Sequence, residues 1–506
     1  MSLFAPRNSL PLMLALAMAL SGCLTESDTY VAGIEGTGAP ATSENTQGTV
    51  TAYGSVIVNG QRVEIGGAAI QVNDESATED AIKLGMNVYI EAERDRRGSV
   101  NVLNVRYNRN LQGPVSEVIH VGSTHKELKV LGQTLIVHDD THFAGIAFEE
   151  LDKGVTLDVS GFVDAEGRVT ATRVAQAATN AMGEVNADVQ GLNASAATFQ
   201  LGSLSVDYAQ AVFVGVSADT LAEGQRVSVR GAKNGDSFVA ERVTLRDQDA
   251  ASMPDGTRVS LEGVVRGYQS AANFRLNGVS VNAEDASISG GELDQLANGI
   301  RVMVKGRIEG SELKAEELRL VLPGVERVVG TVEDINPATG EVVVMGLTYV
   351  ATSLTAFEDR TPSPNRLIGM TEIRVGDQVE LFARDLGEQV LATRIKRIDG
   401  DSGVVTLRGP VTEINQADNQ IMVKNVWVNL GEDLGAEMIP NLSLGDMVTV
   451  EGTLTGSREI SAEVLNILDV PGLSGCFPPG LGCAPPRELT SSRLEWDGME
   501  PPTFRF

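Results

Sequence analysis

Histidines are the side chains in this sequence best suited to bind a metal ion, and all four lie within 23 residues of one another. They are His120, His125, His138 and His142. In the segment 138–142 (His-Asp-Asp-Thr-His), His138, Asp140 and His142 would share one face of a β-strand, because side chains alternate along a strand. Two imidazoles and a carboxylate there could bind Zn²⁺ or a similar divalent ion. A polar strand end is the alternative, since other segments place Asp207, Asn282 or Asn429 at the matching position.

The first of the three cysteines, Cys23, follows an apolar stretch, residues 10–20, and completes the string Leu-Ser-Gly-Cys. This string resembles a bacterial lipobox, which implies diacylglycerol transfer to the Cys23 thiol, cleavage before Cys23 and acylation of the new amine. The apolar stretch is shorter than the roughly 20 residues that a membrane span needs. We therefore expect residues 1–22 to be a signal peptide and the lipid to hold the protein at its membrane. Leu24 favours the outer membrane, at its periplasmic face or at the cell surface.

The other two cysteines, Cys476 and Cys483, lie in a segment rich in Gly and Pro. An envelope location is oxidising, so a small disulfide loop is the natural interpretation. A metal-binding pair is the alternative, although two thiols without a nearby histidine make a poor site. We expect no cofactor other than the acyl chains on Cys23, unless the histidine segment binds a divalent metal.

The composition limits the classes of partner. The chain has 506 residues, 68 acidic against 40 basic side chains, and a formal net charge of −28. Such a surface repels phosphate backbones, and aromatic residues make up only 4% of the chain, so we predict no nucleic-acid binding. The sequence contains no Gly-x-Ser-x-Gly, Walker A or His-Glu-x-x-His motif, and we therefore predict no enzymatic activity.

Six copies of one pattern must position these residues. The pattern is an aliphatic residue, two variable residues, Gly, two variable residues and then alternating aliphatics. Its glycines are Gly85, Gly154, Gly224, Gly299, Gly376 and Gly445. Regular self-similarity of this kind indicates tandem modules. We expect a single helical turn that ends at each glycine, because glycine tolerates the left-handed conformation found there.

The remaining signals recur in a fixed order within each module. A first strand carries Gly-x-Val or a close variant, starting at Gly48, Gly113, Gly183, Gly263, Gly330 and Gly409. A second alternating strand, a variable stretch, the helical turn and two further strands follow. A glycine or alanine that ends the fourth strand predicts a β-bulge or a barrel corner. The last strand shows Ala-x-x-aliphatic, except that the first module has Val102 and Val105 and that Ala462/Val464 is one residue short.

This order predicts an all-β chain of six five-stranded Greek-key barrels of the OB type, joined in a line. A six-bladed propeller-like ring is the alternative. The predicted parts are a signal peptide (1–22), a flexible tether (23–47), barrel repeats at 48–110, 111–179, 180–250, 257–324, 325–400 and 403–470, and a tail (471–506). The tail either packs on the last barrel or serves as a docking peptide.

The repeats also resemble a known family. Residues 33–38 (Gly-Ile-Glu-Gly-Thr-Gly) and 53–60 (Tyr-Gly-Ser-Val-Ile-Val-Asn-Gly) are similar to those of an uncharacterised bacterial domain family, DUF family 5666. The resemblance covers residues 33 to about 470 and is strongest in the first module. It implies lipoproteins built of tandem barrels and supplies no catalytic residue.

These observations lead to one functional expectation and one alternative. The preferred reading is a non-enzymatic, lipid-anchored protein of the bacterial cell envelope that acts as a spacer, scaffold or adaptor. Its partners would be the membrane, through the lipid, and an envelope protein or glycan. The alternative is specific binding of a protein, glycan or small ligand in the grooves of the OB-like barrels.

Overall fold

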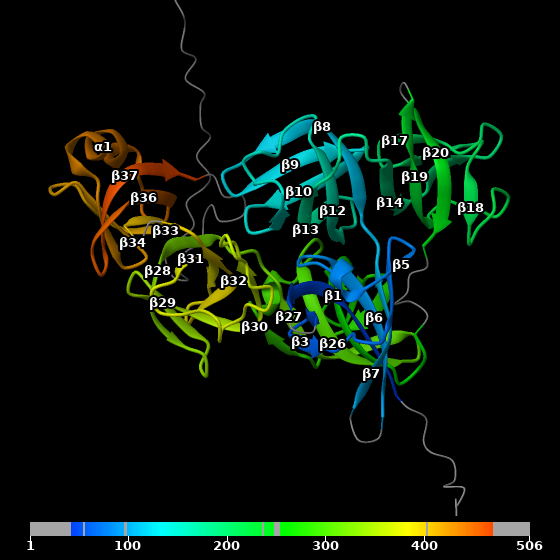
Figure 1. The fold of residues 1–506 in the computed structure, drawn as a ribbon, viewed down its shortest axis with the longest axis horizontal. Helices are drawn as coiled ribbons and strands as arrows, with labels where there is room; N and C mark the ends of the chain where they lie inside the picture. The colour runs from blue at the N-terminus through cyan, green and yellow to red at the C-terminus, as the bar shows by residue number, and fades with distance from the viewer. Residues whose placement is uncertain are drawn as a thin grey trace, which may run out of the picture. The chain divides into compact units, whose positions relative to one another are not determined.

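The computed structural model describes residues 42–53, 56–95, 99–234, 237–246, 253–400 and 403–468. Cys23, Cys476 and Cys483 lie outside these residues, as do residues 33–38. Within the described part the chain is almost entirely β-sheet (Figure 1). None of the helices described there is both long enough and apolar enough to cross a membrane.

The second repeat shows how one barrel closes. It contains β8 (Leu111–Val121), β9 (His125–Val130), β10 (Gln133–His138), β11 (His142–Ala144), β12 (Thr156–Val163) and β13 (Val169–Gln176). Strand β8 pairs with β9 and β12, β9 with β10, β10 in parallel with β13, and β13 with β12. This closed five-stranded ring with one parallel pair is an OB-type barrel, whereas propeller blades are open four-stranded sheets. The predicted fold class is therefore confirmed.

Four further repeats use the same ring. The third comprises β14 (Gly183–Asp188), β15 (Gln190–Asn193), β16 (Thr198–Leu201), β17 (Leu204–Asp207), β18 (Val212–Val214), β19 (Arg226–Asn234) and β20 (Ser237–Leu245). The fourth comprises β21 (Arg258–Val264), β22 (Arg266–Ser270), β23 (Asn273–Leu276), β24 (Val279–Asn282), β25 (Ser287–Ser289), η2 (Leu293–Gln295), β26 (Arg301–Glu309) and β27 (Glu312–Leu320). Their parallel closing pairs are β17 with β20 and β24 with β27.

The fifth and sixth repeats follow the same plan (Figure 1). The fifth comprises β28 (Glu326–Asn336), β29 (Glu341–Val344), β30 (Leu347–Asp359), β31 (Gln378–Asp385) and β32 (Val390–Ile398). The sixth comprises β33 (Val404–Asn415), β34 (Gln420–Val423), β35 (Val426–Asn429), α1 (Gly431–Met438), η3 (Ile439–Asn441), β36 (Met447–Gly456) and β37 (Glu459–Ile467). Here the closing pairs are β30 with β32 and β35 with β37.

The first repeat departs from this ring. It comprises β1 (Thr42–Ala52), β2 (Val56–Val58), β3 (Gln61–Val63), β4 (Ala69–Val72), β5 (Glu75–Ala77), η1 (Glu79–Ala81), β6 (Asn87–Arg94) and β7 (Val100–Tyr107). The last strand, β7, pairs in parallel with β4, and among the described residues β3 pairs with β2 alone. The first barrel is therefore open between β3 and β7.

The Leu-x-x-Gly pattern has a structural explanation that is the same in all six repeats. Each glycine has a φ between 79° and 95°. Its N–H donates to the carbonyl of a valine on the first strand at 2.8–3.0 Å, and that valine's N–H donates to the carbonyl of the residue after the glycine at 2.8–2.9 Å. The aliphatic residue that opens the pattern is buried in the core in every copy. We call this feature the Leu-x-x-Gly turn.

Several details differ from the sequence predictions. The 3₁₀ helices η1, η2 and η3 end before the Leu-x-x-Gly turn rather than at its glycine. The second strands that the alternation predicts at 201–206, 276–281 and 345–350 are in fact hairpins. The chain reverses inside each one at positive-φ residues, for example Asn277 and Gly278. In the last strand Leu465 pairs with Val450 and is buried, so the aliphatic partner of Ala462 is Leu465 and not Val464.

The third repeat begins its pattern four residues later than predicted. Val189, and not Val185, makes the hydrogen bonds to the Leu-x-x-Gly turn, so Ala187 occupies the place of the first-strand glycine. In the second repeat a Cβ on that glycine, Gly113, would lie 2.7 Å from the side chain of the hairpin residue Leu131. The third repeat has Gly202 at this hairpin position, and because Gly202 has no side chain, alanine is tolerated opposite it.

The predicted β-bulges are present. The strand register shifts immediately before Ala92, Gly161, Gly231, Gly306, Ala383 and Gly452. At the four glycines a Cβ would lie only 2.0–2.2 Å from a backbone carbonyl oxygen of the last strand. The bulges bend the fourth strand so that the small sheet can close.

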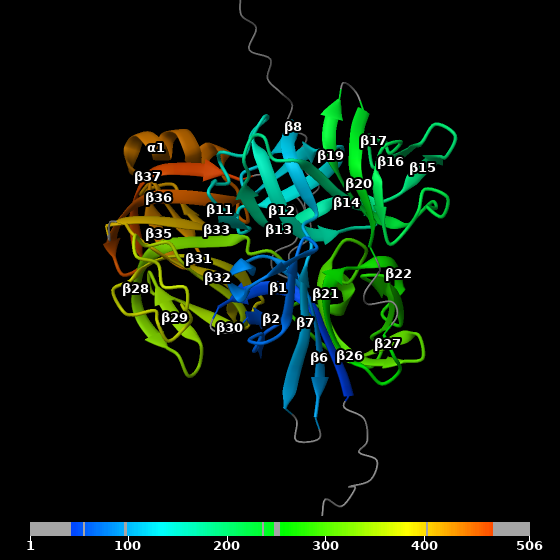
Figure 2. The same cartoon turned by 45° about the vertical axis from the view of Figure 1, so that its right-hand side comes forward.

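The sequence predicts six independent barrels joined in a line, and the structure differs from this prediction. The described residues between 42 and 468 form one compact unit, in which pairs of barrels share a sheet. Strand β8 pairs with β14, β28 with β33, and β1 in parallel with β21 (Figure 2). The first barrel is thus joined to the fourth, the second to the third and the fifth to the sixth. The second and third barrels share one continuous apolar core, and so do the fifth and sixth.

Part of the predicted tether belongs to this sheet. Residues 42–47 form the first half of β1 and pair with β6 and β21. They are polar and carry no apolar alternation, so nothing in their sequence predicts a strand. Tertiary pairing with two neighbours imposes the extended conformation instead.

Candidate functional site

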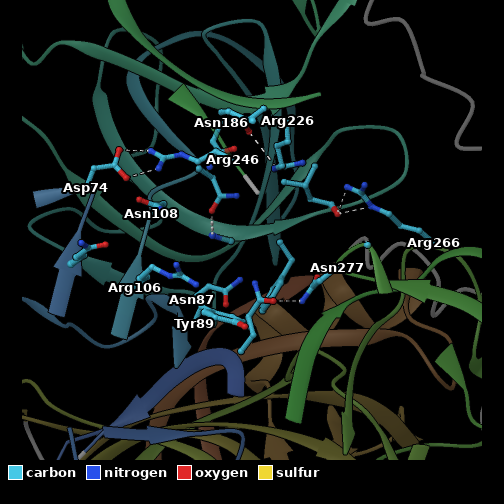
Figure 3. A pocket seen from close by; sticks show the side chains of 18 residues that line it. Asp74, Asn87, Tyr89, Arg106, Asn108, Asn186, Arg226, Arg246, Arg266 and Asn277 are labelled. Atoms are coloured by element: carbon cyan, nitrogen blue, oxygen red, sulfur yellow. Dashed lines mark hydrogen bonds and ion pairs between the residues drawn. The ribbon is translucent and has the colours of Figure 1, made fainter. Parts of the chain in front are cut away.

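A polar cavity of about 350 Å³ is the strongest candidate for a ligand site in the described part of the chain (Figure 3). Residues of the first four repeats line it. They are Gln47, Gln71, Asp74, Asn87, Tyr89, Arg106, Asn108, Asn110, Gly161, Phe162, Val163, Asn186, Arg226, Leu245, Arg246, Arg266, Asn277 and Gly278. We call this cavity the arginine–amide pocket, because four arginines and seven Asn or Gln side chains are in its wall.

Three of the four arginines form ion pairs. Arg246 makes two contacts with Asp74, at 2.5 and 2.8 Å, which join the third barrel to the first. Arg226 bonds Asp188 at 3.1 Å. Arg106 bonds Glu91 at 2.9 Å and lies over the ring of Tyr89, 5.0 Å from its centroid. The ion pairs fix the direction of three guanidinium groups around the cavity.

The fourth arginine, Arg266, is held differently. Its Nε and Nη2 donate to the backbone carbonyl of Val163, at 3.1 and 2.6 Å (Figure 3). Within the described residues no carboxylate forms an ion pair with it. Burial lowers the pKa of the Arg266 guanidinium, and the positive charge of Arg226 lowers it further. The charges of Asp188, Asp164 and Glu166 act in the opposite direction and raise the pKa. None of these three carboxylates forms an ion pair with Arg266 among the described residues, so its guanidinium keeps donors for an external acid group.

The amides divide into those that build the wall and those with unused hydrogen-bonding capacity. Asn110 accepts a bond from the Gly161 N–H at 2.7 Å, and Asn277 donates to Gln47 at 3.0 Å. In contrast, the amide oxygens of Asn87 and Asn186 are buried and have no partner among the described residues. A buried polar group without a partner costs about 1–3 kcal/mol.

The predicted metal-binding residues do not converge. Strand β10 ends at His138, residues 139–140 form a turn, and β11 begins at His142, so the three side chains do not share one strand face. Asp140 accepts a bond from the backbone N–H of Gly324 at 2.9 Å. Within the described residues no group of three or more His, Cys, Asp or Glu side chains could hold a metal ion.

His142 instead forms a buried contact between the second and fifth barrels. Its Nδ1 lies 3.1 Å from Glu358 Oε2. Burial lowers the pKa of His142 to about 4. Burial alone would raise the pKa of Glu358, but the bond to His142 and the charges of Arg394 and Arg360 hold it below its ordinary value. At neutral pH a neutral imidazole therefore donates to a carboxylate.

His138 faces the other two histidines. The rings of His138 and His125 have centroids 6.0 Å apart, and those of His125 and His120 are 4.9 Å apart. His138 and Asp140 also line a second cavity, of about 370 Å³, whose wall is more apolar and includes residues of the first, fourth and fifth barrels. His138 therefore fits the role of a polar residue at a strand end, as in the other repeats, better than the role of a metal ligand.

Sequence reasoning missed the arginine–amide pocket. Its four arginines lie at different positions within their repeats, and where two lining residues share a position, as Asn87 and Arg226 do two residues after the turn glycine, their residue types differ. No repeat pattern therefore marks the pocket. A local signal does exist at residues 108–110 (Asn-Arg-Asn), which join β7 to β8. This polar connection has none of the Gly or Pro residues typical of a turn, and its two asparagines both line the cavity.

Comparison with known proteins identifies the family. Residues 112–175, 186–244, 262–319 and 329–396 each match the family described as "Domain of unknown function (DUF5666)". The second to fifth repeats of the chain are therefore repeats of this family. The resemblance was expected to be strongest in the first repeat, which these matched segments do not include. The first repeat is also the one whose ring differs.

A search of curated proteins finds no match. Among solved structures, a chain titled "drosophila Unr CSD456" is similar over 42% of this chain and 98% of its own length, with 15% sequence identity and a TM-score of 0.17.

Proposed function

We propose that this protein is a non-enzymatic scaffold of the bacterial cell envelope, held to a membrane by lipid on Cys23. The observation that carries the scaffold is the sharing of sheets between barrels. Three strand pairings join the barrels in twos, and β1 lies between β6 of its own barrel and β21 of the fourth. A backbone ladder between domains resists rotation in a way that a flexible linker does not.

Contacts between the pairs support the same proposal. Thr172 Oγ1 donates to the carbonyl of Gly85 at 2.6 Å, which links the second barrel to the first. Arg360 donates to the carbonyl of Phe143 at 2.6 Å, which links the fifth barrel to the second. Arg408 of the sixth barrel pairs with Asp139 of the second, and its side chain is only 3% exposed. Buried, directional contacts of this kind favour one arrangement of the barrels over many.

The anchor rests on the sequence around Cys23 and on the family resemblance. Labelling cells with radioactive palmitate tests it directly. We expect the wild-type protein to carry the label and to fractionate with membranes, and Cys23→Ser to lose both properties. Cys476→Ser is the matched control, because it removes a thiol but keeps the lipobox. Equal membrane association of wild type and Cys23→Ser would contradict the proposal.

A second candidate function is ligand binding in the arginine–amide pocket. The observation that favours it is the half-buried guanidinium of Arg266 in the pocket wall, which forms no ion pair with a described carboxylate in a chain whose net charge is −28. Binding and scaffolding are compatible, since the pocket forms only where the first four barrels meet.

A further inference from the structure

The chemistry of the arginine–amide pocket restricts what it can hold. We propose that it binds a small anionic sugar, a ligand with one carboxylate or phosphate group and several hydroxyls. This inference rests on the second candidate function and requires the first four barrels to meet, but it does not depend on the lipid anchor. Uronic acids and sugar phosphates share this chemistry, and titration with each separates them.

The need for an acidic group follows from charge. The four arginines of the wall face one lining carboxylate, Asp74. Three of the four guanidinium groups pair with a carboxylate, namely Glu91, Asp188 or Asp74. The fourth, Arg266, feels the charges of Asp164 and Glu166 only without an ion-pair contact, and its described hydrogen bonds go to a neutral backbone carbonyl. A guanidinium presents a planar fork of donors that suits a carboxylate or phosphate, so Arg266 is the expected anchor of the acidic group.

The need for hydroxyls follows from the amides. An amide side chain both donates and accepts, as a hydroxyl does. Within the described part of the chain, the side chains of Asn108 and Gln71 make no hydrogen bond and line the cavity. The amide oxygens of Asn87 and Asn186 and the Nε of Arg246 also lack partners. A polyhydroxylated ligand supplies donors and acceptors together, whereas a bare anion supplies acceptors only.

Size and the position of the aromatic rings exclude the nearest competitors. About 350 Å³ lies at the lower end of the range for small-molecule pockets, roughly 300–1,000 Å³. Nucleotide binding commonly uses exposed aromatic faces on which bases stack. The two lining aromatics, Tyr89 and Phe162, are only 5% and 3% exposed, and an arginine already lies over each ring.

Isothermal titration of the full-length protein in detergent tests the proposal. The four probes are D-glucuronate, D-glucose 6-phosphate, D-glucose and inorganic phosphate, in a phosphate-free buffer. We expect saturable binding of at least one acidic sugar, with glucose and inorganic phosphate each at least tenfold weaker. The acidic sugar that binds identifies the source of the acid group. Absence of saturable binding by both acidic sugars, or phosphate binding as tight as theirs, would overturn the proposal.

Two substitutions in the pocket wall and one control outside it test whether the ligand binds in this pocket. Arg266→Gln removes the anchoring charge and should weaken binding of the acidic sugar about tenfold or more, which is the range for a lost charge-assisted hydrogen bond. Asn108→Ala should weaken it by a smaller factor. Arg258→Gln, on the exposed face of β21 in the same barrel as Arg266, should bind like wild type.

Thermal melting of each variant controls for folding. If Arg266→Gln does not fold, Asn108→Ala decides the question, because its side chain makes no hydrogen bond to the described residues. Unchanged affinity in the folded variants would overturn the assignment of the site. Failure of sugar binding in a protein that still takes up palmitate and resists proteolysis would remove this inference alone. Failure of those two assays would instead count against the scaffold.

Discussion

The Leu-x-x-Gly turns and the arginine–amide pocket obey opposite rules. The turn recurs six times with the same two backbone hydrogen bonds and the same buried aliphatic residue. The pocket occurs once among the described residues, and its four arginines occupy four different positions within their repeats. The repeated residues of the turn build each barrel, whereas the residues of the pocket lie where different barrels meet. Family resemblance therefore reports architecture here, and ligand chemistry has to be sought at the contacts between repeats.

The largest expected effect is in the repeated turn of the sixth barrel. Leu442 is 8% exposed and Leu444, two residues later in the same turn, is 67% exposed. Leu442→Ala should lower the free energy of unfolding by about 2–5 kcal/mol, because it opens a cavity in the core. Leu444→Ala should stay within about 0.5 kcal/mol of wild type. Urea denaturation measures both, and equal effects would contradict the role assigned to the turn.

The next effect tests a contact that does not repeat. His142 faces Glu358, Arg394 and Arg173, and its folded pKa of about 4 lies below the unfolded value of about 6.5. As the pH falls, the unfolded chain takes up the proton first, so the contribution present above pH 6.5 is lost progressively towards pH 4. Between pH 7 and pH 5 this loss should reach about 2 kcal/mol.

The variant His142→Gln separates the contribution of His142 titration to the free energy of unfolding from the contributions of the other titrating groups. Glutamine can still donate to Glu358 but does not titrate. Urea denaturation of both proteins at pH 7 and pH 5 should show a shallower pH dependence for the variant. An identical pH dependence would mean that the imidazole is not held neutral in the folded protein.

A smaller effect separates backbone strain from packing in the turn. Gly445 has a φ of 90°, and a Cβ there would meet nothing within 4 Å. Gly445→Ala should therefore cost about 1 kcal/mol through conformation alone. Gly456 of the same barrel lacks a positive φ, and its nearest contact would be an ordinary 3.5 Å. Gly456→Ala should be nearly neutral in the same urea assay, and a comparable loss there would contradict this explanation.

The smallest expected effect on stability is in the pocket. Asn108→Ala removes a half-buried side chain that makes no hydrogen bond to the described residues, so the free energy of unfolding should change by less than about 0.5 kcal/mol. The same variant should bind the acidic sugar more weakly. A large loss of stability would show that Asn108 supports the fold, and the contrast between repeated and unique positions would then fail.

Sequence reasoning predicted what local patterns encode. The alternation of aliphatics, the bulge glycines and the Gly of the turn predicted six OB-type barrels, and the bulges are where Gly161 and its equivalents placed them. It failed where a partner distant in the sequence decides the structure. The pairing of β1 with β21 joins residues more than 200 positions apart, and nothing in the polar segment 42–47 predicts it. The shift from Val185 to Val189 was missed because Ala187 replaces a glycine whose only requirement is space for a hairpin side chain.

The candidate site shows the same division. His138, Asp140 and His142 were grouped because a continuous strand would align them, but a turn at residues 139–140 separates them. Arg266 and Asn108 drew no attention, because each is an ordinary polar residue within its own repeat. Only the meeting of four barrels makes them neighbours of one cavity.

Limited proteolysis of the purified protein tests the central claim, that the barrels form one assembly. The shared sheets within the pairs and the contacts between the pairs together predict a single resistant core that contains residues 42–467 and is cut only in its exposed loops. Early accumulation of single-repeat fragments, each folded and separable from the others without denaturant, would contradict the shared sheets. It would also mean that the arginine–amide pocket, which needs residues of four repeats, does not form.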